Sequence, residues 1–241
     1  MADRERDLAE RRREHLILRV DRADPSKNIL RGFKAYDTML ADHPELRGRV
    51  TFLALVQPSR GDVEQYVDYL EAIRGAVAQV NDRHGNAEWQ PVELSLEGDF
   101  DEVVAAYRSF DVLVVNPVAD GMNLVAKEAA LLNTNDGVLA LSENAGAHEE
   151  LGEFAVTLYP FDTQQQADAM FAALTMDPQQ RRDRPQPQPA PRSGRTTSPS
   201  GPRTSCATCA SCAGRRRENA QVWAYDRPMT ASTAAPARCR A

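Results

Sequence analysis

Cysteine and long apolar runs are both missing from the first 205 residues of this 241-residue sequence. Disulfide-stabilised secreted domains are built on cysteine, so the cysteine-free part of the chain is typical of a protein from a reducing compartment. Met1–Arg13 is highly charged and lacks the apolar core of a secretory signal, and no segment approaches the roughly 20 apolar residues of a membrane span. These absences predict a soluble, cytoplasmic protein.

Leucine, isoleucine and phenylalanine are absent after Met176. Residues 181–241 contain 12 arginines and 3 acidic residues, a net charge of +9, whereas the residues before them carry 17 basic and 32 acidic side chains. A segment without large aliphatic residues cannot offset its ordering entropy by burial. We therefore expect a charged lead-in over 1–14, a folded domain over 15–178, and a disordered basic tail over 179–241.

Short apolar segments alternate with amphipathic ones along the expected domain. Segments with the composition of buried strands occupy 16–20, 51–56, 92–96, 111–115, 138–141 and 154–159. Helical spacing of apolar residues marks 32–40, 62–82, 101–108, 123–132 and 164–174. This alternation predicts parallel βαβ units and an α/β fold with a doubly wound, Rossmann-like parallel sheet. Ligands of such sheets bind at the carboxyl ends of the strands, so the loops that follow the strands are the candidate binding loops.

The loop after the first predicted strand carries two cations, Arg22 and Lys27. At the carboxyl end of a strand they could clamp a diphosphate, the arginine through its forked donors and the lysine as a point charge. A surface loop in which Arg22 pairs with Asp21 or Asp24 explains the same residues. This segment alone favours that simpler interpretation, because exposed ion pairs are common.

The loop after the second predicted strand places Arg60 beside residues that can cap a helix. Ser59 or Asp62 can cap the helix that follows, and an acidic side chain there suits the helix dipole. Arg60 gains nothing from that dipole, so its position suggests an anionic ligand, although a solvated arginine is the commoner case.

The loop after the fourth predicted strand is the most informative. Gly121 permits a tight turn or a close ligand, and free N–H groups at the helix start near Asn123 form a site for an anion or a hydroxyl. Asp120 can accept hydrogen bonds from sugar hydroxyls, and Glu128 can hold the two hydroxyls of a ribose. An ordinary capped helix accounts for these residues about equally well. His148, in the loop after the fifth strand, is assigned no catalytic role.

Five segments in these loops form an ordered set: VDRADPSK at 20–27, PSRGDVEQY at 58–66, DGMNLVAKE at 120–128, SENAGAHEEL at 142–151 and ALTM at 173–176. The set resembles the retaining glycosyltransferases that make trehalose 6-phosphate from a nucleotide-diphosphate glucose and glucose 6-phosphate. DGMNLVAKE is a long string of low ambiguity, and the resemblance extends over residues 15–176. It implies one half of a two-domain GT-B enzyme, the half that binds the donor.

The resemblance also implies roles for individual residues. Arg22 and Lys27 would hold the donor diphosphate, and Arg60 would reach the phosphate of the acceptor. The donor glucose, phosphate and ribose would be bound by Asp120, Gly121, Met122, Asn123, Leu124, Val125 and Glu128, with the amides of Leu124 and Val125 on phosphate and Glu128 on the ribose. Arg22, Lys27 and Asp120 are the predicted catalytic residues. No metal and no other cofactor is implied.

Family members carry an amino-terminal domain that supplies most contacts to the acceptor, and this sequence starts just before the second domain. We therefore expect half of the cleft, and a fragment that is inactive by itself. Two alternatives stay open: a sister transferase with another acceptor, such as a glucosylglycerol-phosphate or pseudo-disaccharide synthase, and a non-catalytic fragment that binds nucleotide sugars. Nucleic-acid binding through the basic tail is a weak hypothesis, because the tail lacks stacking aromatic residues and an ordered scaffold. The nucleotide base and the oligomeric state are left open.

In the predicted tail, the spacing of Cys206, Cys209 and Cys212 is one that metal ligands can have. A closed zinc site needs a fourth ligand, and Cys239 is the only other candidate in the tail, which has no histidine. The abrupt change to an arginine-, proline- and alanine-rich composition is more typical of translation in a shifted reading frame, so that interpretation is favoured over a metal site.

Overall fold

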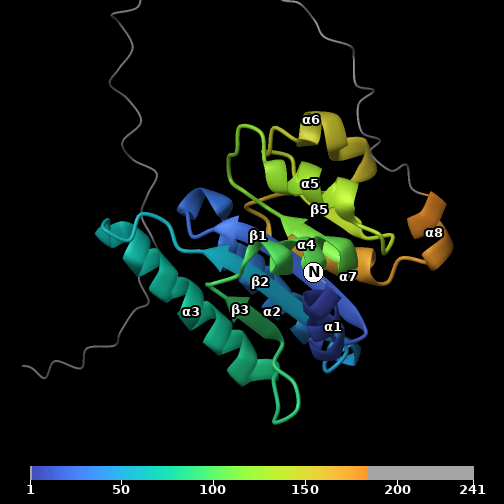
Figure 1. Ribbon diagram of the computed structural model, residues 1–241, viewed down its shortest axis with the longest axis horizontal. Coiled ribbons are helices and arrows are strands. Elements are labelled where there is room, and N and C mark those ends of the chain that lie inside the picture. The colour runs from blue at the N-terminus through green and yellow to red at the C-terminus, as the bar shows by residue number, and fades with distance from the viewer. Residues whose placement is uncertain (1, 184–241) are drawn as a thin grey trace, which may run out of the picture. The chain divides into compact units, whose positions relative to one another are not determined.

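The computed structural model describes residues 2–183, which form a parallel six-stranded sheet flanked by helices (Figure 1). The strands are β1 (His15–Arg22), β2 (Val50–Gln57), β3 (Val92–Ser95), β4 (Val112–Val115), β5 (Val138–Ser142) and β6 (Val156–Leu158). The helices are α1 (Ala2–Arg11), α2 (Ile29–Asp42), α3 (Glu64–His84), α4 (Phe100–Ser109), α5 (Leu124–Leu132), α6 (His148–Leu151), α7 (Thr163–Leu174) and α8 (Pro178–Asp183). Short 3-10 helices occupy Pro25–Lys27, Pro44–Leu46 and Gly152–Phe154. Every predicted strand is present, with boundaries shifted by a few residues.

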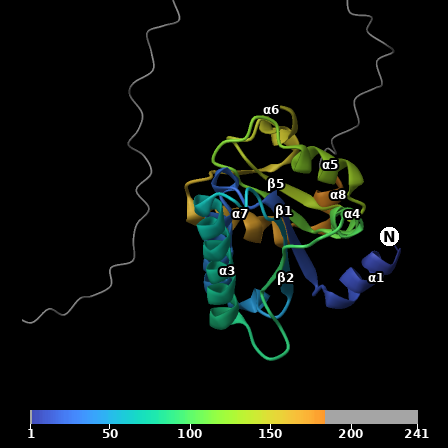
Figure 2. The same ribbon diagram turned by 60° about the vertical axis from the view of Figure 1, so that its left-hand side comes forward.

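Each face of the sheet carries its own apolar core, because successive side chains of a strand point to opposite faces. Ile17 and Phe52 pack on one face with α2, α3 and α7, whereas Leu18 and Leu53 pack on the other with α1, α4 and α5. The turned view shows α3 on one side of the sheet and α1, α4 and α5 on the other (Figure 2). Coverage of both faces explains why the strands are almost continuously apolar in the sequence.

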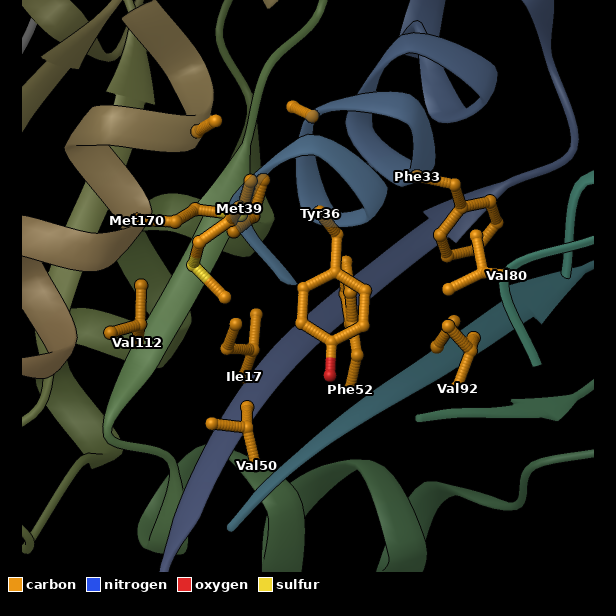
Figure 3. Packing of buried hydrophobic residues seen from close by; sticks show 14 of the residues in the cluster. Ile17, Phe33, Tyr36, Met39, Val50, Phe52, Val80, Val92, Val112 and Met170 are labelled. Carbon is orange, nitrogen blue, oxygen red and sulfur yellow. The ribbon is translucent and has the colours of Figure 1, made fainter. Parts of the chain in front are cut away.

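The core under α2 is built around the ring of Phe52 (Figure 3). The rings of Phe33 and Tyr36, both fully buried, meet it edge-on with centroids 5.4 and 5.0 Å away. Met39 continues the same face of α2 toward Met170 of α7 (Figure 3). Truncating a buried aromatic side chain costs about 3–5 kcal/mol. This packing fixes the start of α2, and with it the loop that joins β1 to α2.

The strand order is β3-β2-β1-β4-β5-β6, and the paired strands run parallel. The predicted doubly wound, Rossmann-like sheet is confirmed. The order reverses between β1 and β4, which pair directly, with Ile17 opposite Val112. The chain leaves β1 toward α2 on one face and leaves β4 toward α5 on the other. A crevice between the two outgoing loops is the expected ligand position in this topology.

Two helices form in segments that composition assigned to the flanks of the domain. Within the expected lead-in, α1 places Leu8 in the core beside α4, with 3% of the residue exposed. At the other end, α8 crosses the expected boundary at residue 178. Arg181 of α8 is buried and donates to the carbonyl groups of Ala173 and Leu174 at 2.6 and 2.9 Å, which caps the end of α7. The packed region therefore continues through Arg181.

Within residues 2–183, none of the helices combines the length and the apolar character that a membrane crossing would need. The remaining expectations for the tail, including its disorder, lie outside the described residues.

Candidate functional site

The loop between β1 and α2 presents two cations from a tightly bonded turn. Asp24 caps the short helix that follows, because its carboxylate accepts hydrogen bonds from the amide and the hydroxyl of Ser26 at 2.9 and 2.7 Å. Lys27 ends that helix and is partly buried, whereas Arg22 is the last residue of β1 and is exposed. Both cations line one pocket at the carboxyl edge of the sheet.

A buried polar network lies behind this loop, and sequence reasoning missed it. Arg19 of β1 is fully buried, and its guanidinium donates to Asp21 at 3.1 Å, to the carbonyl of Lys27 at 3.3 Å and to the side chain of Asn116. Gly32 of α2 leaves room for it, since a Cβ atom there would lie 2.8 Å from the guanidinium. A buried arginine is unstable without such partners. Its only signal in the sequence is a charged residue inside an apolar strand.

Asp21 connects this network to the pocket, which it also lines. Only 6% of its side chain is exposed. Burial raises the pKa of Asp21 to about 6, and the nearby positive charges of Arg19 and Lys27 offset only part of that effect. A carboxylate that titrates near neutral pH thus lies beside the cations of the loop.

The turn between β4 and α5 is tied to the loop after β5. The amide of Asp120 donates to the carbonyl of Asn144 at 3.2 Å, and the carbonyl of Asp120 accepts from the amide of Gly146 at 2.8 Å. A Cβ atom on Gly146 would collide with the main chain of Gly121, so this close approach requires glycine. Asn123 has a left-handed backbone with φ of 69°, and its side chain accepts a hydrogen bond from the first turn of α5 at 3.0 Å. Asn123 is therefore the cap of α5, and the carboxylate of Asp120 is not used for capping.

Lys27 and Asp120 come from different loops and meet in an ion pair between Nζ and Oδ2. Only 14% of the lysine side chain and 17% of the aspartate side chain are exposed. The side-chain amide of Asn123 also donates to Asp120, at 3.0 Å. The structure thus brings a residue predicted to bind diphosphate into contact with one predicted to bind sugar.

A pocket of about 510 Å³ lies at the carboxyl ends of β1 and β2, next to Lys27. Of the predicted donor-binding residues, Arg22, Lys27, Val125 and Glu128 line it. Most of the remaining wall is apolar and comes from β2, the loop after β3, α4 and α5, and it includes Leu55, Leu96, Val103, Tyr107 and Leu132. This size and this mixture of apolar wall and few polar groups are typical of small-molecule sites. Sequence reasoning missed the apolar wall because these residues also fit the core-facing pattern of their own strand or helix.

The other predicted donor residues lie outside the pocket wall, in the turn before α5 and at Leu124, the first residue of that helix. Met122 and Leu124 are exposed, at 53% and 58% of the residue surface. Gly121 has open space around its Cα, so a ligand can approach its main chain closely.

Arg60 lies outside the pocket wall but is linked to the loop after β1. It adopts a left-handed backbone with φ of 46°, and its guanidinium donates to the hydroxyl of Tyr66 at 3.0 Å and lies over the tyrosine ring at 5.1 Å. The same hydroxyl donates to the carboxylate of Asp24 at 3.3 Å. This chain of contacts holds Arg60 near the cations of the loop and outside their pocket.

His148 makes a side-chain hydrogen bond with Thr157 at 3.0 Å and is not part of the pocket wall. No group of three or more histidine, cysteine, aspartate or glutamate side chains in residues 2–183 is arranged to hold a metal ion. The cysteines considered as metal ligands lie outside the described residues: Cys206, Cys209, Cys212 and Cys239.

Residues 1–188 match the model of glycosyltransferase family 20. The chain belongs to this family. It is 38% identical over 168 residues to the UDP-forming alpha,alpha-trehalose-phosphate synthase of Botryotinia fuckeliana, which covers 69% of this chain and 32% of the relative. It is also 38% identical over 172 residues to the trehalose-6-phosphate synthase of Sodalis glossinidius, covering 70% of this chain and 36% of that relative. The chain thus spans about a third of the length of these relatives.

Solved structures of the family contain a matching domain. A UDP-forming alpha,alpha-trehalose-phosphate synthase from Burkholderia xenovorans matches with a TM-score of 0.71 at 35% identity, covering 74% of this chain and 41% of that chain. A structure from the same organism in complex with glucose-6-phosphate matches with a TM-score of 0.69 at 33% identity, over 74% of this chain and 39% of that one. An E. coli structure bound with UDP-2-fluoro glucose matches with a TM-score of 0.69 at 33% identity, covering 76% of this chain and 40% of that chain. These matches confirm the predicted fold as one Rossmann-like half of a GT-B glycosyltransferase.

Proposed function

We propose that this chain is the donor-binding half of a retaining glucosyltransferase. The reaction is transfer of glucose from a nucleotide-diphosphate glucose to glucose 6-phosphate, which gives α,α-trehalose 6-phosphate. The observation that carries the proposal is the meeting of Lys27 and Asp120 beside a pocket lined by Arg22 and Glu128, at the point where the strand order reverses. The relatives named above are trehalose-phosphate synthases, and one related structure holds glucose-6-phosphate.

The donor fits the site in three parts. The apolar pocket takes the nucleoside, with the carboxylate of Glu128 on the ribose hydroxyls. Arg22, Lys27 and the amides of Leu124 and Val125 at the start of α5 take the diphosphate, since both cations and free helix N–H groups favour anions. The glucose lies toward the turn before α5, at Asp120, Gly121, Met122 and Asn123.

Catalysis in this proposal comes from positioning and from charge. As the glycosyl bond breaks, negative charge develops on the departing diphosphate, and Arg22 and Lys27 stabilise that charge. Asp120 holds the sugar while its anomeric carbon is transferred. Neither a metal nor another cofactor is part of the proposal, and it places the protein in the cytoplasm.

Arg60 takes the phosphate of the acceptor. Its guanidinium is held by Tyr66 next to the donor loop but outside the donor pocket, which suits a contact with a second substrate. The remaining acceptor contacts come from a second domain. Because the chain spans about a third of its relatives, we expect it to bind donor and not to turn over alone. A sister transferase with a different acceptor would share this donor site, and acceptor competition in a two-domain enzyme separates the two.

Calorimetric titration of the whole chain with UDP, GDP and their glucose conjugates tests the proposal. Binding of one nucleotide series is the expected result, together with no measurable nucleotide release when glucose 6-phosphate is added. Turnover needs the acceptor held against the donor with water excluded, and half a cleft provides neither. Robust disaccharide synthesis by the purified chain would contradict the half-enzyme interpretation. If neither the UDP nor the GDP series binds, the proposed donor site is wrong.

A further inference from the structure

The ion pair between Lys27 and Asp120 occupies both residues that the donor needs. Lys27 is assigned to the diphosphate and Asp120 to the glucose, and in the structure each holds the other. The pair is largely shielded, with 14% and 17% of the two side chains exposed, so solvent and salt screen it less than a surface pair. A phosphate that binds Lys27 therefore competes with Asp120 for the ammonium group.

Among residues 2–183, Asp120 forms its ion pair with Lys27, and the other cation of the pocket, Arg22, is assigned to the same diphosphate. The other side-chain partner of Asp120 in that range is the neutral amide of Asn123 at 3.0 Å. The buried Arg19 of β1 is itself paired with Asp21 at 3.1 Å. If Lys27 turns to a phosphate, Asp120 is left as a poorly hydrated carboxylate with one amide donor. Leaving such a charge without a partner is unfavourable.

A nucleoside diphosphate and a nucleotide-diphosphate glucose differ in what they offer to Lys27 and Asp120. A nucleoside diphosphate gives Lys27 a phosphate but gives Asp120 nothing. A nucleotide-diphosphate glucose gives Lys27 a phosphate and gives Asp120 sugar hydroxyls, which donate hydrogen bonds to the carboxylate. The intact donor therefore replaces both ends of the ion pair, and the spent nucleotide replaces only one.

We infer that Asp120 determines specificity for the intact donor over the nucleoside diphosphate, by competing with phosphate for Lys27. This inference rests on the proposed function and adds a role for Asp120 beyond contact with the sugar. After transfer, Asp120 loses the sugar and takes Lys27 back, which favours release of the nucleoside diphosphate product.

The test is a double-mutant cycle of Asp120→Asn and Lys27→Ala, made in the full 241-residue chain. Affinities for UDP and UDP-glucose are measured by calorimetry, with GDP and GDP-glucose as a parallel pair. The side chain introduced by Asp120→Asn keeps an oxygen that can accept from Asn123, and the thermal midpoint of each variant checks the fold. Glu150→Gln is the matched control, because Glu150 forms a lysine–carboxylate pair with Lys127 at 2.6 Å outside the pocket wall.

Asp120→Asn should bind UDP more tightly than the wild-type chain, by roughly three- to tenfold, because Lys27 no longer has to leave a carboxylate. Its affinity for UDP-glucose should be unchanged or weaker, so the preference for UDP-glucose over UDP falls by about tenfold. In the Lys27→Ala background, Asp120→Asn should no longer strengthen UDP binding. Glu150→Gln should match wild type with both ligands.

Three results would overturn the inference. Equal weakening of UDP and UDP-glucose by Asp120→Asn would show a structural role only. Strengthening of UDP that persists in the Lys27→Ala background would show a general effect of removing negative charge. An unchanged preference for UDP-glucose would show that the pair does not discriminate. If the wild-type chain binds neither nucleotide series, the proposed function fails first and this inference fails with it.

Discussion

Arginines at the amino ends of the strands are bonded into the fold, whereas those at the carboxyl ends stand beside an open pocket. Arg12, just before β1, donates to Asp111 at 2.6 Å, and Arg181 closes the end of α7 through two carbonyl groups. Arg22, at the far end of β1, is exposed and its guanidinium donates no hydrogen bond within residues 2–183, and the guanidinium of Arg60 donates only to a tyrosine hydroxyl there. The first set of charges is bonded into the fold, and the second set is free to meet the ligands of the proposed function.

Arg181→Ala should give the largest effect and should act on stability alone. We expect the free energy of unfolding to fall by about 3 kcal/mol, because a buried guanidinium loses hydrogen bonds that close α7. Chemical denaturation measures it, and Arg182→Ala, in the same helix with its side chain bonded only to Gln179, is the control. Equal effects of the two substitutions would mean that α8 is not docked as described.

Lys27→Ala and Glu128→Ala should both cause a clear loss of nucleotide binding. Glu128→Ala should change stability little, whereas Lys27→Ala should also lower it, because Asp120 loses its cation. Each should weaken binding of the nucleoside diphosphate by about 1–3 kcal/mol, since each removes a charge-assisted hydrogen bond. Titration calorimetry measures the loss, and Lys34→Ala, an exposed lysine on α2, is the matched control. Undiminished binding in both variants would place the nucleotide elsewhere.

Asp21 should couple donor binding to proton uptake. Its pKa is raised to about 6 by burial in the free protein, and the negative charge of a bound diphosphate raises it further. Binding therefore takes up protons near that pH, and the affinity for UDP-glucose should fall about threefold as the pH rises from about 5 to about 7. UDP-glucose is the suitable probe because its diphosphate has no group that titrates there.

Calorimetry in buffers of different ionisation enthalpy measures the proton uptake directly. Asp21→Asn should abolish both the uptake and the pH dependence. A wild-type affinity that does not change across this pH range would show that Asp21 does not sense the ligand.

Arg60→Ala should have the smallest effect on the isolated chain, less than about twofold on UDP affinity, because Arg60 lies outside the pocket wall. The same titration checks it. A loss of UDP affinity as large as that of Lys27→Ala would assign Arg60 to the donor. Arg60 and Lys27 would then serve the same substrate.

The arrangement of strands and helices could be predicted because it depends on local patterns. Apolar runs such as 111–115 mark buried strands, and apolar residues three and four apart mark α3 and α7, whatever their neighbours are. The donor residues could also be proposed, since two short strings, VDRADPSK and DGMNLVAKE, carry them. Loops after the strands were the natural place to expect them, because a parallel sheet directs its carboxyl ends to one edge.

The contacts that make the site depend on which strands are neighbours, and no local pattern records that. Lys27 meets Asp120 because β1 pairs with β4, although the two residues are 93 positions apart in the sequence. One partner of the buried Arg19 is Asn116, from another strand end, which reaches it only in the folded chain. By itself the sequence determined the strands and main helices of the sheet, the family and the short segments that hold the chemistry. The tertiary structure decided which charges neutralise one another, because Coulomb forces act over a few ångströms of space and not along the chain.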